Sequence, residues 1–199
     1  EARRIARERL EAARAVLDDR RREDLLVGAL NELLHALDEA AAEAVRRGAV
    51  LTVVYAFPPS TSVKHPHAGP GIRYAARAAA MRIAEHGAER VRSRHPGLEV
   101  QVRAHAGAPA SVLVGSSSDA DLLIIGCRSH DGVAELALGS VTTEVAAWPA
   151  CPTMFVRGGP HTGPGTTVLA AVYIGDPAEE VLAFAFAEAR LRHGSLETI

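Results

Sequence analysis

Between residues 49 and 157, short apolar runs alternate with longer segments of helical composition, and this alternation constrains the fold more than any other feature. The predicted strands are Val50–Phe57, Leu98–His105, Asp121–Cys127 and Thr153–Arg157. The predicted helices between these strands are Ile72–Arg94, Ala108–Ser117, Val133–Leu138 and Ser140–Trp148. Strands separated by helices need crossover connections, so the pattern predicts an α/β fold with an open parallel sheet covered on both faces.

The segment before this alternation is less regular. Residues 1–23 are rich in strong helix formers and are predicted to form an amphipathic helix. Asp24–Leu30 is predicted as a short buried strand, with the continuation of a helix as the alternative. Asn31 is the expected N-cap of a helix over Glu32–Arg47 that ends at Gly48. The first complete domain is therefore placed at residues 24–157.

The C-terminal part of the chain repeats its beginning. Residues 158–166 form a linker rich in Gly and Pro, and Ser60–Gly71 is an earlier loop of similar composition. Val168–Tyr173 is predicted as a strand and Pro177–His193 as a helix. The apolar runs LLVGAL and VLAAVY correspond, and so do the segments that begin at Gly48 and Gly194. This offset of one domain length predicts that residues 167–199 are the opening βα element of a second copy.

Composition excludes several functional classes. The formal net charge is −2, and no basic patch alternates with aromatic residues, so a nucleic-acid-binding protein is not expected. The two cysteines, Cys127 and Cys151, have no metal-site spacing. No apolar run reaches the roughly 20 residues of a membrane span, and the first twenty residues lack the apolar centre of a secretory signal. These features predict a soluble, cytoplasmic protein.

The stretch after the predicted strand Asp121–Cys127 has the features of an anion site. In open α/β sheets, ligands bind beyond the carboxyl ends of the strands. Gly126 is expected to let the backbone turn and approach a phosphate, and Arg128 to add a charged contact. Ser140 is the expected cap of the following helix, whose free N–H groups at Val141 and Thr142 would bind an anion.

In this stretch the chain resembles the universal stress protein family. Nucleotide-binding members carry Gly-x2-Gly-x9-Gly-Ser/Thr, and this sequence has Gly126-x2-Ser129-x9-Gly139-Ser140. The segments DLLIIGCRS, LGSVTTEV, ACPTMFVR and RRGAVLTVVYAFPP are also similar to the family. The resemblance covers roughly Asp24–Arg157 and, in reduced form, Thr167–Ile199. It implies a Rossmann-like five-stranded sheet in the order 3-2-1-4-5 and a homodimer formed through the last strand, at Thr153–Val156.

The resemblance also implies a stress-response regulator that binds ATP or another adenine nucleotide, with Mg²⁺ only as part of Mg-ATP. The residues expected to line the nucleotide are Ala56, Gly126, Arg128, Ser129, Gly139, Ser140, Val141 and Thr142. Two departures favour the alternative of a dimeric scaffold protein without a nucleotide: Ser129 replaces a glycine, and no Asp follows the first strand. No acid–base or nucleophile constellation supports an enzyme, beyond slow ATP hydrolysis at most.

Several other residues are interpreted as structural. His65 and His67 lack further ligands for a metal site, and His130 and Asp131 are too close in sequence to Ser129 to form a triad with it. Cys127 is expected to be a buried, inert thiol. A lone strand and helix cannot bury a core, so Thr167–Ile199 must dock, either on a partner chain or in the position of the first strand.

Overall fold

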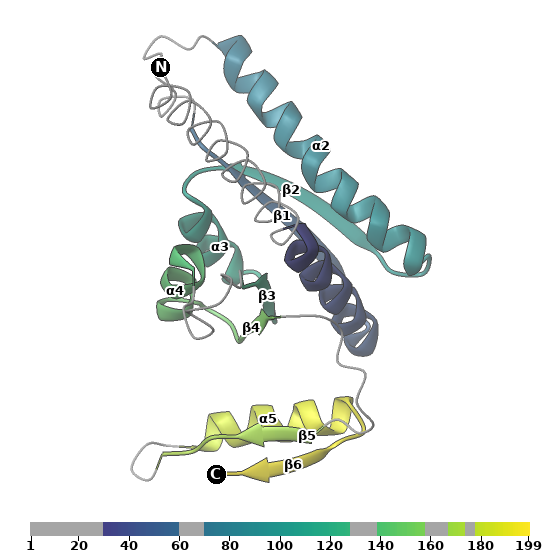
Figure 1. The fold of residues 1–199 in the computed structure, drawn as a ribbon, viewed down its shortest axis with the longest axis vertical. Coiled ribbons are helices and arrows are strands. Elements are labelled where there is room, and N and C mark those ends of the chain that lie inside the picture. The colour runs from purple at the N-terminus through teal and green to yellow at the C-terminus, as the bar shows by residue number, and fades with distance from the viewer. Residues whose placement is uncertain (1–29, 60–69, 128–138, 158–166, 174–177) are drawn as a thin grey trace, which may run out of the picture.

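The computed structural model describes residues 30–59, 70–127, 139–157, 167–173 and 178–199 (Figure 1). The helix predicted at 1–23, the strand predicted at Asp24–Leu30 except for its last residue, and the helix predicted at Val133–Leu138 lie outside the described residues. The elements, in chain order, are a helix over residues 30–47, β1 Leu51–Phe57, α2 Pro70–Arg94, β2 Val100–Ala106, α3 Pro109–Ser117, β3 Leu123–Gly126, α4 Ser140–Ala147, β4 Thr153–Val156, β5 Thr167–Ala170, α5 Glu179–Leu191 and β6 Ser195–Thr198.

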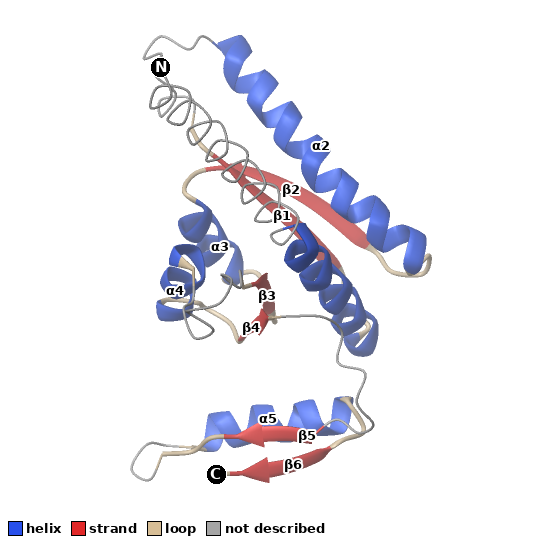
Figure 2. Ribbon diagram, viewed as in Figure 1, coloured by secondary structure: helices blue, strands red, loops and turns tan. Residues whose placement is uncertain are grey.

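The strands pair in three parallel couples, each joined by a helical crossover (Figure 2). β1 pairs with β2, β3 with β4, and β5 with β6. The prediction of an α/β fold with parallel strands is therefore confirmed. The described strands form three two-stranded sheets, however, so the expected order of five strands in one sheet is not confirmed. The tail is also more than the expected βα element, because β6 completes a βαβ unit.

Burial of the strands reflects this pairing. A sheet covered on both faces, as predicted, would bury the strand Val50–Phe57, but every residue of β1 is only half-buried. The four residues of β3 are half-buried as well. Each of these strands has one strand neighbour among the described residues, which leaves its other edge without a strand partner there. β2 alternates between half-buried and exposed residues over most of its length, as its sequence predicts.

Helix 30–47 differs from the prediction at its start and agrees with it at its end. Leu30 and Asn31 already lie within the helix, so Asn31 is not its N-cap and Leu30 is not part of a strand. At the other end, Gly48 has a φ of 58°. This left-handed conformation is easy for glycine because it has no Cβ, and it terminates the helix where the sequence predicts.

A line of small side chains lets α2 pack closely on the β1–β2 sheet. Ala80, Ala84, Ala88 and Val91 recur at helical spacing and are all buried. Gly87 faces helix 30–47, because a Cβ added there would lie 3.3 Å from Leu37 Cδ1 and 3.8 Å from Val53 Cγ1. The helix begins at Pro70, two residues before the predicted start.

A salt bridge across the surface fastens helix 30–47 to α2. Arg90 donates to both carboxylate oxygens of Asp38, at 3.2 and 2.9 Å, and Arg94 donates to one of them at 2.7 Å. Partial burial acts to raise the pKa of Asp38, but the hydrogen bonds and charges of the two arginines outweigh it and hold the pKa below its ordinary value.

Asp38 is therefore expected to make stability depend on pH. Its pKa is lower in the folded protein, so the carboxylate contributes stability above pH about 4, and this contribution is lost as the pH falls through the folded pKa. We expect Asp38→Asn to cost about 1 kcal/mol or less at pH 7, because the pair is partly solvated. Urea unfolding at pH 7 and pH 3 measures the loss of unfolding free energy, with Asp119→Asn at an exposed position as the control. An equal loss at both pH values contradicts the predicted pH dependence of the Asp38 contribution.

A buried hydroxyl joins α3 to the segment before β4. The Oγ of Ser117 accepts a hydrogen bond from the backbone N–H of Ala150 at 2.8 Å and donates to the Val114 carbonyl at 2.7 Å. Ser117 is 1% exposed. Removal of the hydroxyl would leave a backbone donor unsatisfied unless the loop moves.

We expect Ser117→Ala to destabilise the protein by about 1–3 kcal/mol, measured by chemical unfolding. Ser116 is the matched control, because its hydroxyl donates only to the carbonyl of Val112 within the same helix. Ser116→Ala should therefore change stability by roughly 0.5 kcal/mol or less. If the two substitutions changed stability equally, the hydrogen bond from Ala150 to Ser117 would make no contribution to stability.

Candidate functional site

The predicted nucleotide motif lies in the β3–α4–β4 unit. Gly126 is the last residue of β3, and Gly139 directly precedes α4. Cys127 follows β3, is fully buried, and donates its backbone N–H to the Val156 carbonyl at 2.8 Å. Arg128 and Ser129 lie outside the described residues. The structure therefore positions the two ends of the motif, one on a strand and one on a helix.

Gly126 is packed against helix 30–47. A Cβ added to Gly126 would lie 3.1 Å from the backbone oxygen of Glu32 and 3.3 Å from the Cβ of Ala36. The expected reason for glycine here was the approach of a phosphate. The structure supplies a different one, since the absence of a side chain lets the helix lie directly over the end of β3.

The start of α4 differs in one detail from the prediction. Gly139, with φ −61° and ψ 160°, is the N-cap, and Ser140 is the first helical residue, so Ser140 does not cap the helix. The first backbone bond of the helix runs from the Thr143 N–H to the Gly139 carbonyl at 2.9 Å. The N–H groups of Ser140, Val141 and Thr142 consequently have no acceptor within the helix.

No described residue crowds the space beside Gly139. A Cβ built on it would meet only the Thr142 Oγ1 at 3.8 Å among the described atoms, which is an ordinary contact. Ser140 is exposed, Val141 is half-buried, and Thr142 is 4% exposed. The positive end of the α4 dipole and its free N–H groups therefore adjoin an uncrowded glycine, which is the arrangement that anions bind.

Ala56 belongs to a different part of the fold. It lies in β1, where it is half-buried and paired with His105 of β2. Just beyond these strands, the Gly107 N–H donates to the Phe57 carbonyl at 2.9 Å. Among the described residues, no hydrogen bond links Ala56 to Gly126 or to Gly139. The predicted site residues therefore lie on three elements, with Gly126 at the end of β3, Gly139 to Thr142 at the start of α4, and Ala56 in β1.

Cys127 is buried, as predicted, and Cys151 is half-buried. Burial raises the pKa of the Cys151 thiol; a backbone hydrogen bond at Leu123 lowers it, and the nearby charge of Asp121 raises it further. A raised pKa lowers the thiolate fraction at neutral pH and so reduces nucleophilicity. Within the described parts of the chain, no three His, Cys, Asp or Glu side chains cluster closely enough to hold a metal ion.

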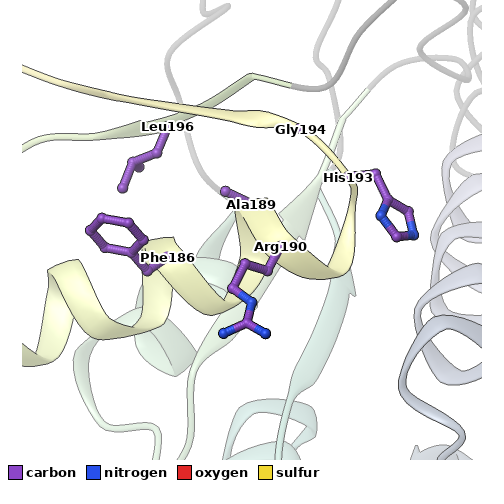
Figure 3. A pocket seen from close by; sticks show the side chains of 6 residues that line it. All are labelled: Phe186, Ala189, Arg190, His193, Gly194 and Leu196. Atoms are coloured by element: carbon purple, nitrogen blue, oxygen red, sulfur yellow. The ribbon is translucent and has the colours of Figure 1, made fainter.

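A shallow depression lies elsewhere, between α5 and β6 (Figure 3). Its lining residues are Phe186, Ala189, Arg190, His193, Gly194 and Leu196. Phe186 and Leu196 lie on one side of α5, and the Arg190 guanidinium points away from them. None of the predicted site residues lines this depression. Its mainly apolar surface, with no convergent polar groups, does not have the character of a specific ligand site.

Comparison with known families identifies the fold. The model of the universal stress protein family matches residues 25–157. The chain belongs to the universal stress protein family. The match covers the units β1–α2–β2 and β3–α4–β4, and it agrees with the resemblance seen in the sequence.

Solved structures of similar proteins include other universal stress proteins. One, in complex with cAMP, is 26% identical, with 62% of this chain and 86% of that chain covered and a TM-score of 0.44. The universal stress protein from Archaeoglobus fulgidus is 22% identical, with 61% and 86% covered and a TM-score of 0.42. UspA from Lactobacillus plantarum is 21% identical, with 61% and 87% covered and a TM-score of 0.44. Among curated proteins, none matches this universal stress protein significantly.

No helix in the described segments of this universal stress protein has the length and apolar character needed to cross a membrane. The sequence reasoning also missed a group of charged residues, Glu43, Arg47, Glu188 and Arg192, that joins two distant helices. The available signal was a Glu-x3-Arg pair near the end of each predicted helix, which is ordinary on helical surfaces.

Proposed function

We propose that this universal stress protein is a regulatory protein that binds an adenine nucleotide at the N-terminus of α4. The observation that carries the proposal is the open space at Gly139, next to three N–H groups with no intrahelical acceptor. The phosphates of ATP are the natural ligand for such a site, because they carry negative charge and several acceptor oxygens. Mg²⁺ enters only with ATP.

The remaining predicted residues have supporting roles in this proposal. Gly126 shapes the end of β3, Arg128 pairs with a phosphate, and the Ser129 hydroxyl donates to one. Ala56 lines the space for the base. Occupancy by the nucleotide would bias the conformation of a dimer, and hydrolysis at most accompanies binding slowly. No catalytic role is assigned to any residue.

A scaffold protein of the same fold is the second candidate. It is favoured by Ser129, which replaces the glycine of the nucleotide-binding pattern. It is also favoured by the lack of an Asp at the end of the predicted first strand, where the sequence reads Val27-Gly28-Ala29-Leu30-Asn31. In this reading the α4 N-terminus meets solvent, and the function lies in the contacts that the dimer makes with other proteins.

Calorimetric titration separates the two candidates. We expect heat of binding with Mg-ATP at high-micromolar protein, and a response to AMP or cAMP if recognition is directed mainly at the adenosine. Cyclic AMP is included because a universal stress protein of similar structure is known in complex with it. If Mg-ATP, AMP and cAMP all give no heat, the nucleotide-binding proposal fails and the scaffold proposal stands.

We also propose the complete sheet order 3-2-1-4-5 for the domain. The numbers in this order count the strands of the domain along the chain. Strands 2 and 3 are β1 and β2, and strands 4 and 5 are β3 and β4. Both pairs are adjacent and parallel in the structure, as the proposed order requires. In this order, a first strand lies between β1 and β3 and pairs with both.

A homodimer through β4 is the corresponding proposal for assembly. β4 pairs with β3 along one edge, and the described residues place no strand on its other edge. The Leu123 N–H donates to the Pro152 carbonyl, so in a parallel ladder the N–H of Thr153 points away from β3. Such an edge pairs readily with another strand.

Light scattering after size exclusion is expected to give twice the mass of one chain. Thr153→Pro removes an outward donor without breaking the β3–β4 ladder, so it is expected to raise the dimer dissociation constant by roughly tenfold with little change in helicity. Ala146→Val, on the exposed face of α4, is the control. A wild-type monomer contradicts a dimer, and a dimer insensitive to Thr153→Pro contradicts this edge.

A further inference from the structure

Helix 30–47 and α5 end in the same local structure. Glu43 and Arg47 are four residues apart, and so are Glu188 and Arg192. The Arg47 Nε donates to the Glu43 Oε2 at 3.2 Å. The Arg192 Nε donates to the Glu188 Oε2, also at 3.2 Å. Each helix thus carries an identical Glu–Arg pair in its last two turns.

The turns that follow these pairs repeat as well. The Gly48 N–H donates to the Val45 carbonyl at 3.2 Å, and the His193 N–H to the Arg190 carbonyl at 3.1 Å. Gly48 and His193 have φ values of 58° and 52°. The Ala49 and Gly194 N–H groups bond the carbonyls of Ala44 and Ala189 at 2.9 and 2.8 Å, which makes both turns Schellman motifs.

This equivalence corrects the register expected from the sequence. Gly48 was matched to Gly194, but the structural equivalent of Gly48 is His193, which adopts the left-handed conformation. Residues 43, 47 and 48 therefore correspond to residues 188, 192 and 193, at a constant separation of 145 positions.

The two equivalent pairs bond each other reciprocally. An Nη2 of Arg47 donates to the Glu188 Oε1, and the Nη2 of Arg192 donates to the Glu43 Oε1. Each carboxylate therefore accepts from the Nε of its own helix's Arg47 or Arg192 through Oε2 and from the other arginine through Oε1. The Glu43 Oε1 also accepts a hydrogen bond from the Arg46 Nη2 at 3.0 Å. The four side chains form a closed, neutral ring, which we call the Glu–Arg ring, with local two-fold symmetry. The C-terminal ends of helix 30–47 and α5 lie next to each other accordingly (Figure 1).

The ring is largely shielded from water. The side chains of Glu43 and Glu188 are 2% and 7% exposed, and those of Arg47 and Arg192 are 24% and 19% exposed. A buried carboxylate is costly unless its partners remain in place, and the loss of one partner costs far more than the loss of a surface pair. Cations also belong at helix C-termini, where both arginines lie.

We propose that the C-terminal βαβ unit, residues 167–199, docks on the universal stress protein domain through the Glu–Arg ring, as a two-fold interface between repeat-related first helices. The partner surface is therefore a second repeat of the same kind, provided within this chain. This docking differs from both modes considered from the sequence, a swap into the first-strand position and pairing with another chain's tail. It does not depend on nucleotide binding.

Hydrogen exchange of the full chain tests the proposal. Residues 167–199 are too few to bury a stable core of their own, so undocking should expose their amides to exchange. We expect Arg47→Ala to speed exchange in β5, α5 and β6 by roughly a hundredfold, because it removes a partner from both buried carboxylates. Arg46→Ala is the matched control: Arg46 lies on the same helix and donates to Glu43 at 3.0 Å but, within the described residues, makes no ion pair with α5.

A charge swap tests whether the ring itself is responsible. Arg47→Glu alone places three carboxylates together and should abolish the protection of residues 178–199. Adding Glu188→Arg restores two cross-helix pairs and should recover protection even if Arg47→Ala does not fold. Equal protection in Arg47→Ala and Arg46→Ala, or no rescue by the swap, overturns the proposal. Protection that falls on tenfold dilution also overturns it, because the ring would then join separate chains.

Discussion

Gly126→Val is expected to lower the free energy of unfolding by about 3 kcal/mol, the upper end of what overpacking costs. A Cβ alone would lie 3.1 Å from the Glu32 backbone oxygen and 3.3 Å from the Ala36 Cβ, so neither neighbour is the flexible end of a side chain. The valine methyl groups would extend further into the same helix. Relief requires helix 30–47 to move away from β3, which also strains its ion pairs with α2 at Asp38.

Urea unfolding of the variant measures this cost, and Gly115→Ala provides the control. Gly115 lies in α3, and a Cβ added there meets nothing within 4 Å. Alanine in a helix is favoured over glycine, so Gly115→Ala is expected to stabilise by about 0.5–1 kcal/mol. The substitutions at the two glycines are therefore expected to change the free energy of unfolding in opposite directions. A Gly126→Val protein as stable as the wild type would show that helix 30–47 does not lie over β3 in solution.

The parts of the fold that depend on neighbours in sequence were predictable. Pro109 starts α3 because its ring fixes φ and its missing N–H is not needed there. Gly48 ends helix 30–47 because it reaches a positive φ without strain. The apolar run of β3 and the alternation of β2 likewise gave the strands within about two residues. Local backbone preferences decide all of these features.

The parts that depend on distant neighbours were not predictable. The contact that explains Gly126 comes from Glu32, and the one that explains Ser117 comes from Ala150. A residue's sequence neighbours carry no information about such partners. The Glu–Arg ring shows the same limit: each Glu-x3-Arg pair is visible in the sequence, but its cross-helix bonds join residues 141 and 149 positions apart.

The candidate site likewise has one part that depends on local sequence and one part that depends on distant contacts. The helix start after Gly139 follows from local signals, and the sequence placed it within one residue, with Gly139 rather than Ser140 as the cap. The distance between that helix start and Ala56 depends on how the strand pairs assemble, which one sequence does not specify. The N-terminus of α4 is therefore the part of the site on which a decisive substitution can be made.

Gly139→Val is expected to weaken Mg-ATP binding by at least about a hundredfold, or about 2.7 kcal/mol, which abolishes the calorimetric signal. The branched side chain would occupy the open space over the N–H groups of Ser140 and Val141, where the proposed phosphates lie. The folded protein should tolerate it. The φ of −61° and ψ of 160° are accessible to valine, and among the described residues the nearest atom to the new Cβ is 3.8 Å away. The stability cost is therefore the loss of a favourable N-cap, about 1 kcal/mol or less.

Substitution of the two glycines should have different main effects. Gly126→Val should mainly lower stability, and Gly139→Val should mainly weaken Mg-ATP binding. Ala146→Val is the matched control for Gly139→Val: it adds the same side chain type to the exposed face of α4, away from its N-terminus, and should leave the titration unchanged. If the wild type binds Mg-ATP and Gly139→Val binds it equally well, the phosphates do not lie at the start of α4. A nucleotide would then have to be held by the residues around β1, where Ala56 is the predicted contact, and the free N–H groups of α4 would take no part in recognition.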